Sequence, residues 1–207
     1  MKNRAQILNL LLAMALVVLA IKIALINSEK ATTQRDTTME TILTRSSVRS
    51  YTDKVVEPEK FEQLLRAAMS APTAVNKQPW AFIVVTDRAL LDTLSVLLPY
   101  GKMLNTATTA IVVCGDLNKA LLEVNQAYWV QDCSAASQNI LLAAHAMGLG
   151  AVWTGVFPRE DRVSDVRGVL NIPDHLVPLN VIPVGYPNGD STPKDKWNID
   201  NIYYNRW

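Results

Sequence analysis

The segment Arg45-Ser46-Ser47-Val48-Arg49 places two guanidinium groups around two hydroxyls. A guanidinium binds two oxygens of a phosphate at once and serine hydroxyls donate further hydrogen bonds, so these residue types at this spacing suit a phosphate group. The same residues would also make an ordinary solvated basic turn, and both interpretations stay open on this segment alone. A second basic pair, at positions 194 and 196, lies in a polar stretch where exposed lysines are common.

The spacings of other common catalytic sites are missing. The sequence has no G-x-x-x-x-G-K-[ST] phosphate loop, no G-x-S-x-G nucleophile turn and no H-E-x-x-H zinc motif. The two histidines are too few for a histidine-rich metal site. Cys114 and Cys133 have no C-x-x-C spacing and lie in apolar surroundings, which is typical of core thiols. We therefore expect no metal site and no catalytic acid, base or nucleophile.

Four segments in chain order resemble those of the FMN-dependent nitroreductase family. They are residues 45–51 (RSSVRSY), residues 70–80 (SAPTAVNKQPW) with the apolar run after them, residues 148–155 (GLGAVWTG), and residues 183–187 with 193–196 (PVGYP and PKDK). The resemblance covers about residues 40–207. The chain has Lys196 where the family often has Arg, which keeps the positive charge but loses the two-pronged contact of a guanidinium.

At the phosphate end of the cofactor, the resemblance implies that Arg45, Ser46 and Ser47 contact the phosphate and ribityl chain of FMN. It also implies that Lys194 and Lys196 complete the phosphate clamp. The contacts with the flavin ring and its adjoining chain correspond to Arg49, Pro72, Thr73, Asn76, Thr154 and Gly155. A cation at Arg49 would stabilise the anionic reduced flavin, and a glycine at Gly155 would let a backbone N–H approach N5 of the ring closely.

The activity implied by the resemblance is a two-step transfer of electrons through FMN. A reduced nicotinamide, NAD(P)H, or another donor would reduce the flavin, and a nitroaromatic, a quinone or a similar small-molecule acceptor would then take the electrons. Family members are typically homodimers with FMN between the subunits. The alternative is a membrane-tethered flavin-binding or interaction domain without turnover. With 20 Lys and Arg against 19 Asp and Glu, no overall field favours nucleic acid as a partner.

The elements that position these residues follow from apolar periodicity and from proline and glycine signals. Helices are predicted at 58–70, 126–148 and 159–170, and buried strands at 81–86, 110–114 and 179–184. Helices and strands do not alternate strictly. We therefore expect an α+β domain. The resemblance implies a central mixed, mostly antiparallel sheet flanked by helices.

An apolar block from Ala5 to Ile26 precedes this domain. At about 1.5 Å per residue it is long enough to span a bilayer core of about 30 Å. We expect residues 1–27 to be a membrane anchor or signal segment, residues 28–40 a polar linker, and residues 41–207 the nitroreductase-like FMN-binding domain. Lys2 and Arg4 place the domain on the outer (periplasmic or extracytoplasmic) side of the membrane. The alternative is secretion after signal cleavage, although no clear small-x-small cleavage site follows the block.

Overall fold

The computed structural model describes residues 13–24, 37–121 and 128–207, and the chain divides into two compact units, Met1–Leu43 and Thr44–Trp207. In the first unit, residues 13–24 are helical and exposed, and a second helix covers 37–44. Residues 37–40 of the expected linker therefore belong to a helix. The rest of the predicted anchor and linker, at 1–12 and 25–36, lies outside the described residues. Within the described ranges, no helix combines the length and apolar character needed to cross a bilayer.

The second unit is built on one five-stranded sheet with the order β1-β2-β5-β3, and β4 also pairs with β5. The strands are β1 (Trp80–Val85), β2 (Thr109–Asp116), β3 (Gly150–Ala151), β4 (Thr154–Gly155) and β5 (Leu176–Gly185). The short strands β3 and β4 occupy successive stretches along the same edge of β5. All strand pairs formed by the described residues are antiparallel, so the sheet is antiparallel where a mixed one was expected.

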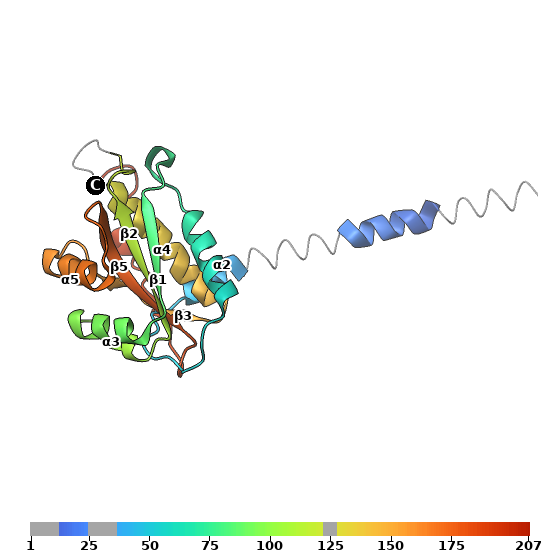
Figure 1. Cartoon of the computed structure of the whole chain (residues 1–207). Coiled ribbons are helices and arrows are strands. Elements are labelled where there is room, and N and C mark those ends of the chain that lie inside the picture. The colour runs from blue at the N-terminus through green and yellow to red at the C-terminus, as the bar shows by residue number, and fades with distance from the viewer. Residues whose placement is uncertain (1–12, 25–36, 122–127) are drawn as a thin grey trace, which may run out of the picture. The chain divides into compact units, whose positions relative to one another are not determined.

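Four helices cover the sheet of the second unit, with α2 and α4 on one face and α3 and α5 on the other (Figure 1). They are α2 (Pro58–Met69), α3 (Arg88–Leu97), α4 (Tyr128–Ala146) and α5 (Glu160–Leu170). Pro58 begins α2 at a position where the missing N–H has no helical partner to lose. The α3 helix begins at Asp87, whose side chain accepts a hydrogen bond from the Leu90 N–H at 3.1 Å.

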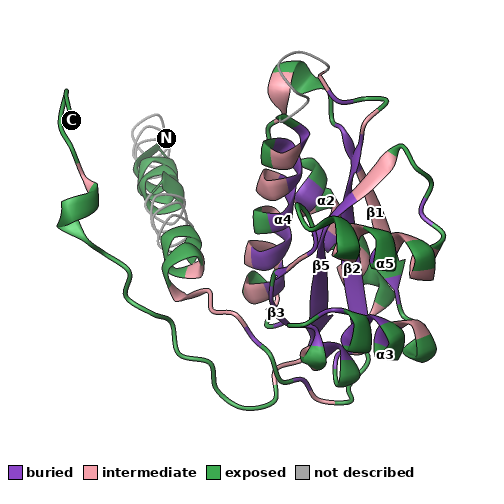
Figure 2. Cartoon of the chain, turned by 90° about the vertical axis from the view of Figure 1, so that its left-hand side faces the viewer, coloured by how far each residue is buried: buried purple, intermediate pink, exposed green. Residues whose placement is uncertain are grey.

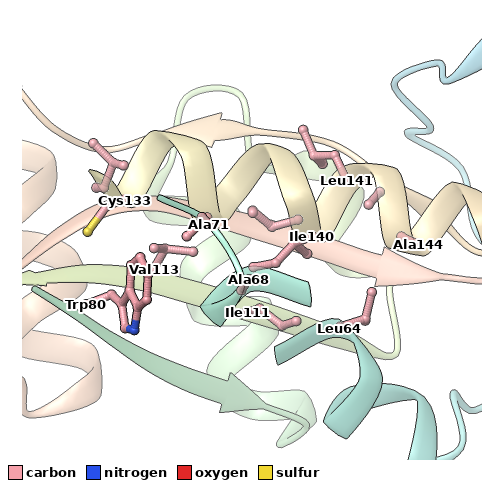
Figure 3. Packing of buried hydrophobic residues seen from close by; sticks show 14 of the residues in the cluster. Leu64, Ala68, Ala71, Trp80, Ile111, Val113, Cys133, Ile140, Leu141 and Ala144 are labelled. Carbon is pink, nitrogen blue, oxygen red and sulfur yellow. The ribbon is translucent and has the colours of Figure 1, made fainter. Parts of the chain in front are cut away.

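The larger part of the core lies between α4, α2 and the sheet. Figure 3 shows Ile140 and Ala144 of α4 above Ile111 of β2, with Leu64 of α2 beside them. Each of these side chains is fully buried. Burying a leucine or isoleucine stabilises the fold by about 1.5–3 kcal/mol, so this layer fixes the position of α4 on the sheet.

One close backbone approach sets the N-terminal end of α4. A Cβ atom on Gly115 of β2 would lie 2.2 Å from the ring of Trp129, so the indole packs directly on the strand backbone. The Trp129 ring also contacts Phe157 edge-on, with ring centroids 4.9 Å apart. Trp129 is thus a core residue.

The structure confirms the α+β class and the predicted elements, with boundaries that differ by a few residues. The strands β2 and β5 are longer than the predicted apolar runs, and in β2 the polar ends Thr109 and Asp116 also pair in the sheet. The helix α3 was not among the predicted elements. The two-residue strands were not predicted either, because so short a strand has no periodicity of its own.

Candidate functional site

The first group of predicted site residues lies in a segment that we call the strap, residues 44–51. Its backbone is tied to the end of the sheet, since the Val48 N–H donates to the Ala151 carbonyl at 3.1 Å and Tyr51 bridges to Pro187. The buried Tyr51 hydroxyl donates to the Val48 carbonyl at 2.7 Å. Burial raises the pKa of Tyr51 above its usual range, so the phenol stays protonated and keeps this bond.

Two glycines make room for the strap on the sheet. A Cβ atom on Gly150 would lie 2.5 Å from Cγ1 of Val48, and one on Gly185 would lie 3.0 Å from the Tyr51 ring. Real Cβ atoms do not approach to 2.5 Å, so Val48 can occupy its place only because residue 150 has no side chain. The strap is therefore fitted to this end of the sheet by shape as well as by hydrogen bonds.

The strap and the start of the C-terminal segment lie side by side. The Asn188 N–H donates to the Ser50 carbonyl at 2.9 Å, and the Ser46 and Ser191 hydroxyls are hydrogen-bonded to each other. Lys194 and Lys196 follow a few residues further along and are exposed. The structure thus brings the start of the predicted phosphate clamp, Ser46, to the segment that carries its C-terminal lysines.

The cations of this region carry uncompensated charge. Among the residues that the structure describes, Arg45, Arg49, Lys194 and Lys196 form no ion pair with a carboxylate. The Arg49 guanidinium donates only to the Ser47 carbonyl, at 3.3 Å. Guanidinium and ammonium groups that pair with no described carboxylate, on segments that also carry serine hydroxyls, are the donor set that a phosphate requires. The residues present therefore fit the phosphate of FMN.

The second group of predicted site residues lies in the turn 73–78, which precedes β1. Its Asn76 side chain is exposed, and its Oδ1 accepts a hydrogen bond from the Gln78 side chain at 3.0 Å. The Thr73 hydroxyl accepts from the Gln78 N–H at 3.1 Å. The turn is joined to α4 by a hydrogen bond of 2.9 Å from the Ala74 N–H to Asp132. Pro72, just before the turn, is also exposed.

The third group, Thr154 and Gly155, forms β4, and its two residues have different surroundings. The Val156 N–H, directly after β4, donates to the Leu179 carbonyl of β5. Successive N–H groups of a strand point to opposite edges, so the Gly155 N–H faces away from β5. The Thr154 side chain is 4% exposed, and its hydroxyl has no hydrogen-bond partner within the described ranges. Only Gly155 thus has a backbone donor directed away from the sheet.

The strap and the turn lie near opposite ends of α4. The strap begins at Thr44, whose hydroxyl is hydrogen-bonded to His145 at 2.9 Å, whereas the turn is attached at Asp132. At about 1.5 Å per residue, the two attachment points are roughly 20 Å apart along the helix. Within one chain, the strap and the turn are therefore two separate groups of predicted site residues.

Sequence reasoning overlooked several residues beside these groups. Lys102 is an exposed residue of the short 3-10 helix η2 (Lys102–Asn105). Its neighbour Met103 packs against the buried cluster of Val48 and Tyr51, so this helix adjoins the strap. Arg162 of α5 donates to the Gly155 carbonyl at 3.3 Å. Neither residue belongs to a recognisable motif, and only the packing of distant segments reveals them.

The two cysteines are buried core residues. Burial raises the pKa of both Cys114 and Cys133 to about 12, and the negative charge of Asp132 contributes to the shift at Cys133. A thiol with so high a pKa is almost wholly protonated near neutral pH and is a poor nucleophile. This agrees with their prediction as core thiols.

Comparison with known proteins identifies the family. The Nitroreductase family model matches residues 42–98 and 95–186. A Methanothermobacter thermautotrophicus protein that carries the name NADH dehydrogenase/NAD(P)H nitroreductase is 48% identical over 169 residues, which cover 82% of this chain and 87% of that protein. The chain belongs to the nitroreductase family.

Solved structures share the fold. A crystal structure from Parabacteroides distasonis, again named NADH dehydrogenase/NAD(P)H nitroreductase, is 54% identical with a TM-score of 0.79, and covers 83% of this chain and 99% of that one. A nitroreductase from Desulfovibrio desulfuricans, solved in complex with FMN, is 29% identical with a TM-score of 0.70, and covers 82% of this chain and 97% of that one. The predicted family and its α+β fold are thus confirmed.

Proposed function

We propose that the chain binds FMN and uses it to transfer electrons from NAD(P)H or another donor to a nitroaromatic, quinone or similar small-molecule acceptor. The observation that carries the proposal is a group of four cations that form no ion pair within the described residues, Arg45 and Arg49 beside the serine hydroxyls of the strap and Lys194 and Lys196 on the C-terminal segment. The relatives named for NAD(P)H nitroreductase activity and the FMN complex of a related structure support it.

The residues of this chain would bind and orient the cofactor. Arg45, Ser46 and Ser47 would hold the phosphate end, and Arg49 would lie nearer the ring. The Gly155 N–H, which faces away from β5, would donate to the ring edge. When bound, FMN supplies the two-electron redox chemistry, and the protein supplies binding, orientation and electrostatics. No catalytic acid, base or nucleophile from the chain is required.

A second copy of the chain would complete the site. One chain holds the strap and the turn roughly 20 Å apart along α4, so two copies with antiparallel α4 helices would bring the strap of one chain near the turn of the other. Half-exposed apolar residues of α4, such as Ala135 and Leu142, are available for this contact. Figure 2 shows half-exposed and exposed residues as well as buried ones along α4. The C-terminal segment also exposes large apolar side chains, with Trp207 97% and Tyr204 79% exposed.

The absorbance spectrum of the purified chain tests the proposal. We expect a yellow protein whose flavin absorbance is bleached by NADH or NADPH without oxygen and restored by a nitroaromatic or a quinone. A protein that takes up no FMN when the cofactor is added contradicts the proposal. Bound flavin that no donor can bleach would instead favour a flavin-binding domain without turnover.

We also propose that the N-terminal block, Ala5 to Ile26, holds the domain at the outer side of a membrane. The proposal rests on the apolar length of the block and on Lys2 and Arg4 before it. On that side free NAD(P)H is scarce, so a membrane quinone or another protein would serve as donor. A reporter enzyme that works only in the cytoplasm, fused after Trp207, should be inactive. An active fusion contradicts this orientation.

A further inference from the structure

Asp132 of α4 is a buried carboxylate that interrupts the apolar stripe of its helix. Its side chain is 6% exposed. One oxygen, Oδ1, accepts a hydrogen bond from the Ala74 N–H at 2.9 Å, and the other, Oδ2, is buried with no hydrogen-bond partner among the described residues. A buried oxygen without a donor destabilises the fold, so fold stability alone does not account for a carboxylate here.

The turn that Asp132 contacts has an unfavourable backbone. Val75, Asn76 and Gln78 have φ values of 42°, 57° and 50°, in the left-handed region that side chains with a Cβ rarely adopt. Val75 is β-branched, which makes this conformation especially costly for it. Such a turn persists only where the surrounding structure fixes it. Apart from bonds within the turn itself, the hydrogen bond from the Ala74 N–H to Asp132 is the one that holds the turn to other described residues.

We propose that Asp132 is a positioning residue that holds the 73–78 turn, and with it Asn76, in the conformation that binds flavin. The proposal rests on the proposed function, because it assigns the turn to the flavin site. A carboxylate oxygen accepts a stronger hydrogen bond from the Ala74 N–H than a neutral acceptor would. The helix that carries this carboxylate is fixed by the core. Asp132 thus holds the strained turn in a fixed position relative to α4.

The affinity of the full chain for FMN, measured by quenching of flavin fluorescence, tests this role. We expect Asp132→Ala to weaken FMN binding about tenfold to thirtyfold and to change the visible spectrum of the bound flavin. Asp132→Asn keeps an oxygen that can accept from Ala74, so it should restore affinity to within about threefold of the original chain. Unchanged affinity in Asp132→Ala, or no rescue by Asp132→Asn, overturns the proposal.

Asn139→Ala is the matched control. Asn139 also lies on α4 and also forms a hydrogen bond to another segment, donating to the Ala67 carbonyl of α2 at 2.9 Å, but it does not contact the turn. Its loss should lower the melting temperature and leave the FMN affinity within about threefold. An equal loss of affinity in Asn139→Ala and Asp132→Ala would mean that any weakened α4 contact has the same effect, and the proposal would fail.

A readout without flavin separates this proposal from the proposed function. Lys77 is exposed in the turn, so trypsin can cut after it once the turn opens. In FMN-free protein, we expect Asp132→Ala to increase cleavage after Lys77 at least fivefold relative to cleavage after Lys54, and Asp132→Asn to increase it much less. If the original chain binds no FMN, the proposed function fails while this assay still tests the turn. Equal cleavage in the original chain and Asp132→Ala overturns the positioning role.

Discussion

The strap, residues 44–51, and the turn, residues 73–78, are held in different ways. The strap is bonded through its backbone to β3 and to the residues after β5, and it packs on glycines that leave room for its side chains. The turn is exposed, carries positive φ values at three residues and is attached to α4 through one carboxylate. We infer that changes near the strap affect the fold together with the cofactor site, whereas changes in the turn affect the site alone.

The largest effect is expected from Gly150→Ala. The new Cβ would lie 2.5 Å from Cγ1 of Val48, so the strap must move away from β3. Overpacking of this kind typically costs about 1–3 kcal/mol. The melting temperature should therefore fall, and FMN affinity should fall at least about a hundredfold because the phosphate-binding residues move together. Thermal unfolding and fluorescence titration measure the two effects.

Gly168→Ala is the control for this substitution. A Cβ on Gly168, in α5, would meet nothing within 4 Å, and alanine is favoured over glycine inside a helix by about 0.5–1 kcal/mol. The variant should be as stable as the original chain or more so. If Gly150→Ala behaved in the same way, the shape fit of the strap would be unimportant.

A smaller and more selective effect is expected when Arg45 and Arg49 are both replaced by alanine. The two guanidinium groups make no ion pair with the described residues, so the fold does not depend on them. FMN affinity should fall about thirtyfold with little change in melting temperature, because two charge-assisted contacts are lost only in the complex. Arg66→Ala, which removes an exposed ion pair on α2, should leave both quantities nearly unchanged. Full FMN occupancy in the double variant would show that the phosphate lies elsewhere.

The proposed site residues of the strap stand out in the sequence, whereas the support of the turn does not. Arg45, Ser47 and Arg49 are recognisable because residue types with phosphate chemistry stand next to each other in the chain. The contact between Gly150 and Val48 joins residues about a hundred positions apart, and no local pattern records it. In the sequence, Asp132 resembles an ordinary polar interruption of an apolar helix stripe. Only the structure shows that it accepts a hydrogen bond from the turn. The α4 helix was predicted because its periodicity is long, whereas β3 and β4 exist only through their pairing with β5.

In the turn, Val75→Gly should raise the free energy of unfolding, whereas Gly150→Ala beside the strap should lower it. Val75 is 74% exposed, so glycine loses little packing there and adopts a φ of 42° without steric cost. We expect the free energy of unfolding to rise by less than about 1 kcal/mol, with FMN affinity within about threefold of the original chain. Val96→Gly, at an exposed site in α3, should instead lower stability by about 0.5–1 kcal/mol. Equal destabilisation by the two variants would mean that the turn stores no strain.

The smallest effect concerns a contact between the residue before α2 and the segment after β5. Glu57, just before the helix that leads to the turn, accepts a hydrogen bond of 2.7 Å from Tyr186, whose carbonyl accepts from Thr52 after the strap. The Tyr186 hydroxyl, with Lys60 and Lys54 nearby, lowers the pKa of Glu57 from the usual 4.5 to about 2. Between these values the unfolded chain binds the proton and the folded chain does not, so this contribution to stability is complete above pH 4.5 and is lost as the pH falls towards 2.

Glu57→Gln therefore should lower the melting temperature slightly near neutral pH, and the difference from the original chain should shrink as the solution is acidified. Because the carboxylate is exposed, salt should weaken the effect at every pH. Glu59→Gln, two residues further along and without an ion pair in the described part of the chain, should leave the melting temperature nearly unchanged. A difference that grows on acidification would contradict the assignment, since a lowered pKa can contribute stability only while the carboxylate is ionised.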